Sequence, residues 1–279
     1  MTDRRPIAIV TGAYGGMGRA CARQLGRRAD LVLCDLDRGR LEELAGNLRA
    51  EGYNVVSTVA GDLSQPGLAQ QAVDAARAAG SLQAVAHTAG VMAGGAWDVI
   101  LRANVVATER LLVALESALE PGLAVVLIAS MAAHLARRSE VDSVLDAPLD
   151  EQMVERVKPY LDALANPGHS SGASLPAYEQ SKRWIVRVCE ARAPAWARAG
   201  VRIVSISPGL ISTPMGRSEI DGNPGAAVLV DQIPLGRWGT ALDIADAVDF
   251  LTSNRATYIS GIDLRVDGAL TPAMRGVGL

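Results

Sequence analysis

The sequence is poor in aromatic residues and in cysteine. Phe occurs once among 279 residues and aromatic residues make up 4% of the chain, so stacking platforms for single-stranded nucleic acids are not expected. The net charge is −3 and no basic stripe is present, which argues against a general nucleic-acid binder. Cys21, Cys34 and Cys189 are scattered and lack CxxC spacing. We therefore expect three reduced, mostly buried thiols, and we assign no metal ligands.

Long apolar runs are also absent. No stretch of about 18 apolar residues occurs, and the first dozen residues do not resemble a signal peptide, so we expect a cytoplasmic protein without a membrane span. With 49% hydrophobic residues, the composition is that of a globular protein that can bury a substantial core. No repeat or linker divides the chain, which predicts a single domain over residues 1–279.

Short apolar runs alternate with longer segments of helical periodicity. Such continuous apolar strands, separated by helices, are typical of a doubly wound parallel sheet with right-handed crossovers. The predicted fold is therefore a Rossmann-type α/β fold with seven parallel strands flanked by helices. The expected strands cover residues 7–11, 31–35, 54–62, 82–90, 124–130, 201–209 and 262–268.

Residues 134–175 break this alternation, because the segment is charged and contains several prolines. It carries one amphipathic patch, which predicts a helix kinked near Pro159. The residues expected to share the apolar face of that helix are Met153, Val157, Tyr160, Leu161 and Leu164. A segment of this length inside a compact fold is usually a lid, an interface element or disordered, and these alternatives stay open.

Glycines crowd the end of the first expected strand, in the stretch "TGAYGGMG". Gly12 permits a tight turn, Gly16 lets a pyrophosphate approach the backbone, and Gly18 lets the following helix pack against the sheet. The N-terminus of that helix offers free N–H groups and a partial positive charge to phosphates. The pattern favours a dinucleotide site over an ordinary glycine-rich turn.

Asp35 ends the second expected strand, 23 residues after Gly12. A carboxylate at this place accepts hydrogen bonds from the adenosine ribose hydroxyls and repels a 2′-phosphate, which favours NAD over NADP. Arg38 lies close enough in sequence to approach a 2′-phosphate instead. The alternative interpretation makes Asp35 an ordinary residue at a strand end.

Tyr178 and Lys182 are one helical turn apart in "YEQSK", so both point to one face. A free Tyr has a pKa of about 10, which a nearby ammonium group lowers toward neutral pH. The pair alone is a weak signal, since its ordinary interpretation is a surface Tyr and Lys on a helix.

Together these motifs resemble those of the short-chain dehydrogenase/reductase family in its compact single-domain form. "TGAYGGMG" matches the family's glycine motif, "GDL" (61–63) its acidic adenine contact and "HTAG" (87–90) its fourth-strand end. "SPGLISTPM" (207–215) resembles the segment after the sixth strand, and "VDGA" (266–269) the C-terminal signature. The matches run from residue 7 to about residue 275 in the family's order.

The resemblance implies a catalytic tetrad of Asn104, Ser130, Tyr178 and Lys182. Tyr178 exchanges a proton with the substrate oxygen, Lys182 holds the nicotinamide ribose, Ser130 orients the carbonyl or hydroxyl, and Asn104 fixes a water of the proton relay. The residues to which the resemblance assigns cofactor binding are Gly12, Tyr14, Gly16, Met17, Gly18, Asp35, Leu36, Asp62, Leu63, Ala89, Gly90, Tyr178, Lys182, Pro208, Gly209, Ile211 and Thr213.

Three features depart from the family pattern. His87 and Thr88 replace the usual Asn pair, and we expect His87 to be a structural residue at a strand end. Tyr14 is bulky where the family often has a small residue. Ser130 and Tyr178 lie 48 residues apart, a much longer separation than is usual, and the extra length is the segment 134–175.

An insertion at this place resembles the 3α-hydroxysteroid dehydrogenase/carbonyl reductase branch of the family. That resemblance implies a ketone or secondary alcohol on a hydrophobic, cyclic, aromatic or steroid-like substrate. In that branch the insertion contributes to a subunit interface, so a homodimer or homotetramer is expected.

The prediction is therefore an NAD-dependent alcohol dehydrogenase or ketone reductase that acts on a small hydrophobic molecule. The alternative is an NAD-sensing regulatory protein that has kept the fold and lost the chemistry, but such a protein has no need of the tetrad. A sugar epimerase or dehydratase of the extended type fits poorly, because its glycine spacing differs and no sizeable C-terminal substrate domain is present.

Overall fold

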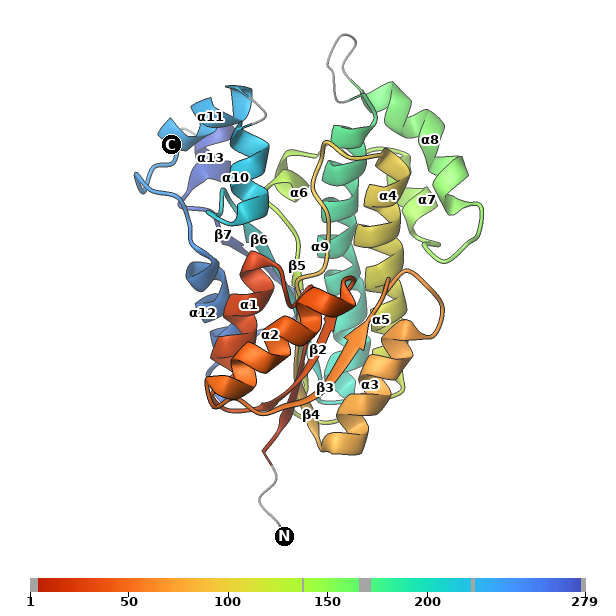
Figure 1. Cartoon of the computed structure of the whole chain (residues 1–279). Coiled ribbons are helices and arrows are strands. Elements are labelled where there is room, and N and C mark those ends of the chain that lie inside the picture. The colour runs from red at the N-terminus through yellow and green to blue at the C-terminus, as the bar shows by residue number, and fades with distance from the viewer. Residues whose placement is uncertain (1–4, 137, 166–171, 222–223, 277–279) are drawn as a thin grey trace.

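Seven parallel strands form one sheet through the centre of the protein (Figure 1). The structure is a computed structural model that describes residues 5–136, 138–165, 172–221 and 224–276. The strands lie in the order β3-β2-β1-β4-β5-β6-β7, and every neighbouring pair is parallel, so the predicted fold class is confirmed. The strands are β1 (Ile7–Thr11), β2 (Asp30–Asp35), β3 (Val55–Ala60), β4 (Leu82–His87), β5 (Ala124–Ile128), β6 (Arg202–Pro208) and β7 (Asp263–Val266).

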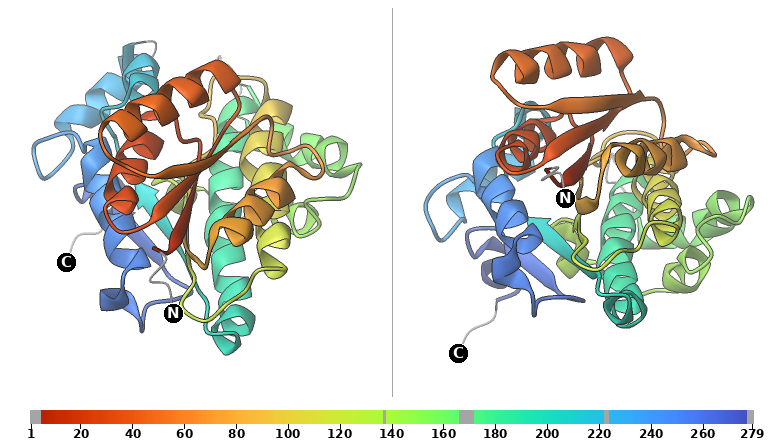
Figure 2. Two further views of the ribbon diagram at one scale, coloured as in Figure 1. Left: turned by 60° about the horizontal axis from the view of Figure 1, so that its bottom comes forward. Right: turned by 90° about the horizontal axis from the view of Figure 1, so that it is seen from below.

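Helices cover both faces of the sheet, as the view along its edge shows (Figure 2). The apolar strands therefore contribute to two cores, one on each face. One face carries α1 (Gly16–Gly26), α2 (Arg38–Ala50) and α12 (Ala241–Thr252). The other carries α3 (Leu68–Ala79), α4 (Trp97–Leu101), the π-helical turn of residues Arg102–Val106, α5 (Ala107–Glu116) and α9 (Ser174–Arg198).

The strand order reverses next to β1, which pairs with β2 on one side and with β4 on the other. In open α/β sheets such a switch point leaves a crevice at the carboxyl ends of the strands, where ligands bind. Here Thr11, the last residue of β1, is the register partner of both Cys34 and His87. The glycine turn that follows β1 therefore lies at this crevice.

Short helices gather at the carboxyl edge of the sheet (Figure 1). They are α10 (Pro214–Asp221), α11 (Pro224–Asp231) and α13 (Leu270–Met274), while a 3₁₀ turn (Asn254–Ala256) follows α12. Among the described residues, no helix is both long and apolar enough to cross a bilayer.

The three cysteines are free thiols in the core, as predicted. Burial raises the pKa of the Cys21 and Cys34 thiols to about 12, and it raises the pKa of Cys189 as well. Thiols with such pKa values carry almost no thiolate at neutral pH and are poor nucleophiles.

The segment between β5 and α9 folds as three helices, α6 (Ala132–Leu135), α7 (Val141–Leu145) and α8 (Met153–Leu164). Met153, Val157 and Leu161 of α8 are fully buried, as the periodicity predicts. The placement of Tyr160 on the same face is wrong, because its side chain lies at the solvent edge of the helix and is 36% exposed. Pro159 lies inside α8, and residues 166–171 of the segment lie outside the described residues.

Ion pairs attach this insertion to the outer surface of α9. The carboxylate of Asp142 in α7 lies 3.1 Å from a guanidinium nitrogen of Arg183 and 3.2 Å from one of Arg187. Arg187 also pairs with Asp146 at 2.6 Å. The two pairs of Asp142 are only partly exposed, and together with the buried face of α8 they place the insertion against α9 (Figure 1).

We expect Leu161→Ala to lower the free energy of unfolding by about 2–5 kcal/mol, because it leaves a cavity beneath α8. Tyr160→Ala, on the exposed side of the same helix, is the matched control and should cost clearly less. Urea unfolding followed by circular dichroism measures both. Equal small losses for the two variants would show that α8 does not pack as part of the core.

Candidate active site

A cavity of about 770 Å³ opens at the carboxyl ends of the strands. Its walls contain all the residues that the sequence predicted for cofactor binding, and Ser130 as well. Asn104, the remaining member of the predicted tetrad, is fully buried and does not line the cavity. One cavity therefore brings together predicted residues that are spread along the chain from Gly12 to Thr213, none of them from the insertion between Ser130 and Tyr178.

Three glycines of the turn after β1 leave no room for a side chain at their positions. Gly12 has φ +61°, and a Cβ on it would lie 2.7 Å from the amide nitrogen of Ala89. A Cβ on Gly16 would lie 2.6 Å from Cγ2 of Thr213, and one on Gly18 would collide with the carbonyl oxygen of Gly12. The bare backbone and the N-terminus of α1 at this turn suit a pyrophosphate group. The residues present therefore fit a dinucleotide.

Asp35 lies where the adenosine end of such a cofactor is expected. Its carboxylate accepts hydrogen bonds from the backbone N–H of Tyr14 (2.8 Å) and of Leu36 (2.7 Å), which hold it at the rim of the cavity. Because these donors come from the glycine turn and from the end of β2, the carboxylate also joins the two segments.

The arginines near Asp35 are not the one that the sequence suggested, Arg38. Arg19 and Arg40 line the cavity, whereas Arg38 does not. The guanidinium of Arg19 lies 3.7 Å from the centroid of the Tyr14 ring, and its Nε donates to the Tyr14 carbonyl (2.7 Å). Arg40 lies 5.7 Å from the same ring and 3.7 Å from the carboxylate of Asp37. Sequence reasoning missed both arginines, because helix geometry turns them toward Tyr14.

The predicted adenine contact lies on the loop after β3. The two carboxylate oxygens of Asp62 accept hydrogen bonds from the backbone N–H and the hydroxyl of Ser64, both at 2.8 Å. Leu63 is buried, and both Asp62 and Leu63 line the cavity. The Asp62 carboxylate is thus held in one orientation before any ligand arrives.

Asn104 lies in a single π-helical turn, Arg102–Val106, between α4 and α5. Its Oδ1 accepts from the N–H of Val91 (2.8 Å), and its Nδ2 donates to the Val91 carbonyl (3.0 Å) and to the Ser181 hydroxyl (3.0 Å). Such π-turns are often found at functional sites. Both amide hydrogens are committed, so the side chain of Asn104 fixes two neighbouring segments.

Lys182 lines the cavity and is largely buried, and its Nζ donates to the Ile128 carbonyl at 3.0 Å. The same nitrogen lies 5.9 Å from the centroid of the Tyr178 ring. Burial lowers the pKa of the Lys182 ammonium to about 8. A Cβ on Gly90 would lie 3.3 Å from this nitrogen and 3.0 Å from Oδ1 of Asn104, so the lack of a side chain there leaves room for both groups.

Ser130 follows β5, and its Oγ accepts a hydrogen bond from the N–H of Ala132 (3.2 Å). Tyr178 is in the second turn of α9, one turn before Lys182, and Ser130, Tyr178 and Lys182 all line the cavity. A hydroxyl, a phenol and an ammonium group therefore line the same cavity.

Met92, Met215 and Trp238 also line the cavity, although no sequence motif assigns a role to any of them. Met92 lies after β4, Met215 in α10 and Trp238 in the loop before α12. No motif marks them, because their contribution is apolar surface. Only the packing of three separate segments around the end of the sheet brings them together.

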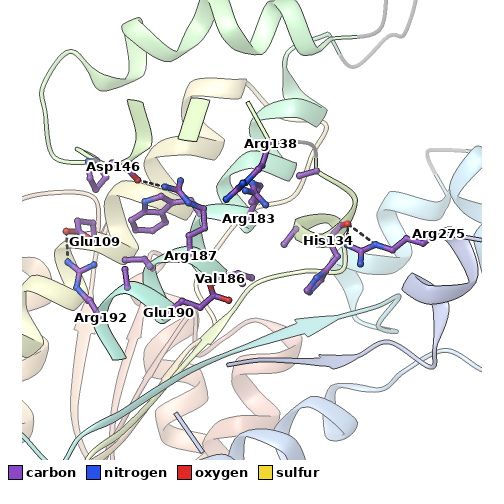
Figure 3. A pocket seen from close by; sticks show the side chains of 16 residues that line it. Glu109, His134, Arg138, Asp146, Arg183, Val186, Arg187, Glu190, Arg192 and Arg275 are labelled. Carbon is purple, nitrogen blue, oxygen red and sulfur yellow. Dashed lines mark hydrogen bonds and ion pairs between the residues drawn. The ribbon is translucent and has the colours of Figure 1, made fainter. Parts of the chain in front are cut away.

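A second cavity, of about 1000 Å³, lies between the insertion and the outer face of α9 (Figure 3). None of the predicted site residues lines it. Most of its arginines are paired, since Arg183 and Arg187 contact Asp142 and Arg192 contacts Glu109 at 2.7 Å. The first cavity is therefore the candidate active site.

Two family profiles match the chain in succession. The profile described as "short chain dehydrogenase" matches residues 6–141, and the one described as "Enoyl-(Acyl carrier protein) reductase" matches residues 166–271. The chain belongs to the short-chain dehydrogenase/reductase family. It is thus an oxidoreductase of the class that interconverts alcohols and ketones with NAD or NADP.

Curated relatives match along almost their full length. The chain is 29% identical to "Short-chain dehydrogenase/reductase bsc3" of Alternaria brassicicola, with 93% of each chain covered. It is 28% identical to "2-(S)-hydroxypropyl-CoM dehydrogenase 3" of Xanthobacter autotrophicus (strain ATCC BAA-1158 / Py2), covering 96% of this chain and 97% of that one. Among solved structures, an actinorhodin polyketide ketoreductase with NADPH superposes with a TM-score of 0.74 at 20% identity, over 96% of this chain and 97% of that one.

We expect Lys182→Met to raise the free energy of unfolding at pH 7, by up to about 3 kcal/mol. The buried ammonium has a pKa of about 8, whereas an unfolded Lys has one of about 10.4. Between these values the unfolded chain binds more protons, so the wild-type protein gains stability as the pH rises.

The advantage of Lys182→Met should therefore shrink as the pH rises from about 8 to about 10.4, the unfolded value. Urea unfolding at pH 7 and at the upper end of this window measures the difference. Lys158→Met, which changes an exposed Lys on α8, is the control and should show no such dependence. A variant that is less stable at both pH values would contradict the cost of burying this charge.

Proposed function

We propose that this oxidoreductase uses NAD(H) to interconvert a secondary alcohol and a ketone on a hydrophobic substrate. The observation that carries the proposal is the single cavity whose walls combine the glycine turn with Ser130, Tyr178 and Lys182. A protein that only sensed NAD would need the first of these features and not the second.

In this proposal Tyr178 exchanges a proton with the substrate oxygen. When an alcohol is oxidised, the Tyr178 phenolate takes the hydroxyl proton while the carbinol carbon gives up a hydride, and the two losses together yield the ketone. Lys182, whose Nζ lies 5.9 Å from the ring centroid, favours the phenolate through its positive charge. The hydroxyl of Ser130, in the same wall, donates to the substrate oxygen and orients it. Bound NAD supplies the hydride chemistry, which the protein supports by position and charge.

In this proposal the main-chain carbonyl of Asn104 binds the water of the proton relay. The side-chain amide has no hydrogen left to donate, because both are given to Val91 and Ser181. The carbonyl accepts from the Thr108 hydroxyl (2.7 Å), and its second lone pair suits a water.

The proposed preference for NAD rests on Asp35 and on the contacts that the nearby Arg19 and Arg40 already make. A carboxylate at the rim favours ribose hydroxyls and repels a 2′-phosphate. Arg19 is stacked on Tyr14 and bound to its carbonyl, and Arg40 faces Asp37. Neither guanidinium is therefore directed freely toward the ribose.

The proposed substrate class follows from the opposite end of the cavity. Val91, Met92, Leu210, Met215 and Trp238 supply apolar surface there, and the described charged residues of the lining other than Lys182 are grouped around the glycine turn, the end of β2 and the loop after β3. An apolar alcohol or ketone buries its surface favourably in such a site. A cyclic, aromatic or steroid-like substrate agrees with this lining.

We also propose that the protein belongs to the 3α-hydroxysteroid dehydrogenase/carbonyl reductase branch. The three helices between β5 and α9 support this assignment, because that branch carries an insertion at the same place. A homodimer or homotetramer, a single domain and a cytoplasmic location stay predictions that accompany it.

We expect Tyr178→Phe to lower kcat by about 10²–10⁴-fold, since the variant has no group to exchange the proton. Binding of NADH should change little, because the ring keeps its shape. Turnover of a panel of cyclic and aromatic secondary alcohols with NAD, followed by NADH absorbance, measures the first quantity, and fluorescence titration measures the second. Tyr160→Phe is the control. Retention of most activity in Tyr178→Phe would refute the mechanism.

Asp35→Ala should raise the KM for NAD by about 10- to 100-fold, because a charge-assisted hydrogen bond to the ribose is lost. The KM for NADP should rise far less, since the repulsion of the 2′-phosphate disappears as well. Asp37→Asn, which keeps a capping oxygen at the start of α2, is the matched control for loss of a nearby carboxylate. Equal losses for both cofactors would show that Asp35 only holds the glycine turn.

A further inference from the structure

His87 is a fully buried polar residue to which the proposed chemistry gives no role. It ends β4, and its ring lies between two hydroxyl groups from different layers of the fold. Its Nδ1 is 2.7 Å from the hydroxyl of Thr11, its register partner at the end of β1, and its Nε2 is 2.8 Å from the hydroxyl of Thr108 in α5. The ring thus connects the strand that precedes the glycine turn with the helix that follows Asn104.

The hydrogen bond that Thr108 makes to Asn104 determines the direction of the two bonds of His87. The Thr108 hydroxyl lies 2.7 Å from the carbonyl oxygen of Asn104. Because a carbonyl oxygen can only accept, Thr108 donates its single hydroxyl hydrogen to it. Toward His87 the same hydroxyl must then accept, which places a hydrogen on Nε2. Burial and the charge of Lys182 lower the pKa of His87 to about 3, so the ring is neutral and its Nδ1 accepts from Thr11.

A one-directional chain of hydrogen bonds results. The N–H of Ala89 points to the Thr11 hydroxyl (3.3 Å), Thr11 donates to His87, His87 to Thr108, and Thr108 to Asn104. Every side-chain donor and acceptor of the chain has a partner, so no member can turn without leaving a buried polar group unsatisfied.

The chain ends on the residue that organises the catalytic wall. Asn104 binds Val91 and the Ser181 hydroxyl, and Ser181 in turn donates to the carbonyl of Tyr178 (2.7 Å). A shift of Asn104 would therefore move the turn of α9 that carries Tyr178 and Lys182.

We propose that His87 is a positioning residue that, as the neutral Nε2–H tautomer, fixes Asn104 and through it the turn of α9 that carries Tyr178. This inference rests on the proposed function for its kinetic test. The tautomer and the chain of hydrogen bonds can be tested by a measurement that does not depend on enzymatic activity.

Thr108 supplies the matched kinetic test. Thr108→Val removes the hydroxyl and keeps the shape, so kcat should fall by about 10- to 100-fold through misplacement of the catalytic groups, while the Kd for NADH changes less than about twofold. Thr108→Ser keeps the hydroxyl and should stay near wild type. Unchanged kcat in folded Thr108→Val, or equal losses in both variants, would overturn the proposal.

Substitution of His87 itself tests the other link. His87→Gln offers one acceptor and one donor on a single group and should retain more activity than His87→Leu. In the double variant His87→Leu/Thr108→Val, the two losses should not add, because either change breaks the same chain. Additive losses, or Gln and Leu variants of equal activity, would show that His87 acts only as core packing.

Nuclear magnetic resonance of the wild-type protein, labelled with ¹⁵N in histidine, tests the tautomer directly. The chain contains three histidines, and the signal missing from His87→Gln identifies His87. At pH 7 its spectrum should show a neutral ring protonated at Nε2. A ring protonated at Nδ1, or at both nitrogens, would overturn the proposal. If no alcohol in the panel is oxidised by the wild-type protein, the proposed function fails, while this measurement still decides the tautomer.

Discussion

The side-chain amide of Asn104 is the contact on which the arrangement of the active site depends. It binds both backbone groups of Val91, after β4, and the hydroxyl of Ser181, in α9. These segments come from different parts of the chain, and the Asn104 side chain joins them. The π-helical turn around Asn104 lets one side chain reach both of them. The part of the cavity wall that carries Tyr178 and Lys182 is therefore held by a residue that does not itself line the cavity.

Burial of Lys182 is the main electrostatic cost of this arrangement. An ammonium group with a pKa lowered to about 8 is destabilised by loss of water, and one carbonyl bond to Ile128 offsets this only in part. The neutral ring of His87 avoids a second positive charge nearby, since the charge of Lys182 is one cause of its low pKa. The cost arises beside Tyr178, where the proposed function requires a positive charge, and perturbed pKa values cluster at functional sites in general.

Most of the fold and the outline of the site could be predicted from the sequence, because both depend on local patterns. The apolar runs are buried strands. The glycines after β1 and the carboxylate at the end of β2 could be placed because these strand ends meet at one edge of the sheet. In the insertion the period of Met153, Val157 and Leu161 identified the buried face. The error at Tyr160 arose because a residue at the margin of an apolar face can turn its polar end to water.

Contacts between segments that are distant in the sequence and share no motif could not be predicted. The tautomer of His87 depends on Thr11 and Thr108, which lie 76 and 21 positions away. The same holds for Tyr14, whose bulk departs from the family pattern. Its ring gives the guanidinium of Arg19 a stacking surface 3.7 Å away, and its carbonyl accepts from the same group. A small residue there would remove this stacking surface, so under the proposed function the aromatic ring and the Asp35 carboxylate both favour NAD over NADP.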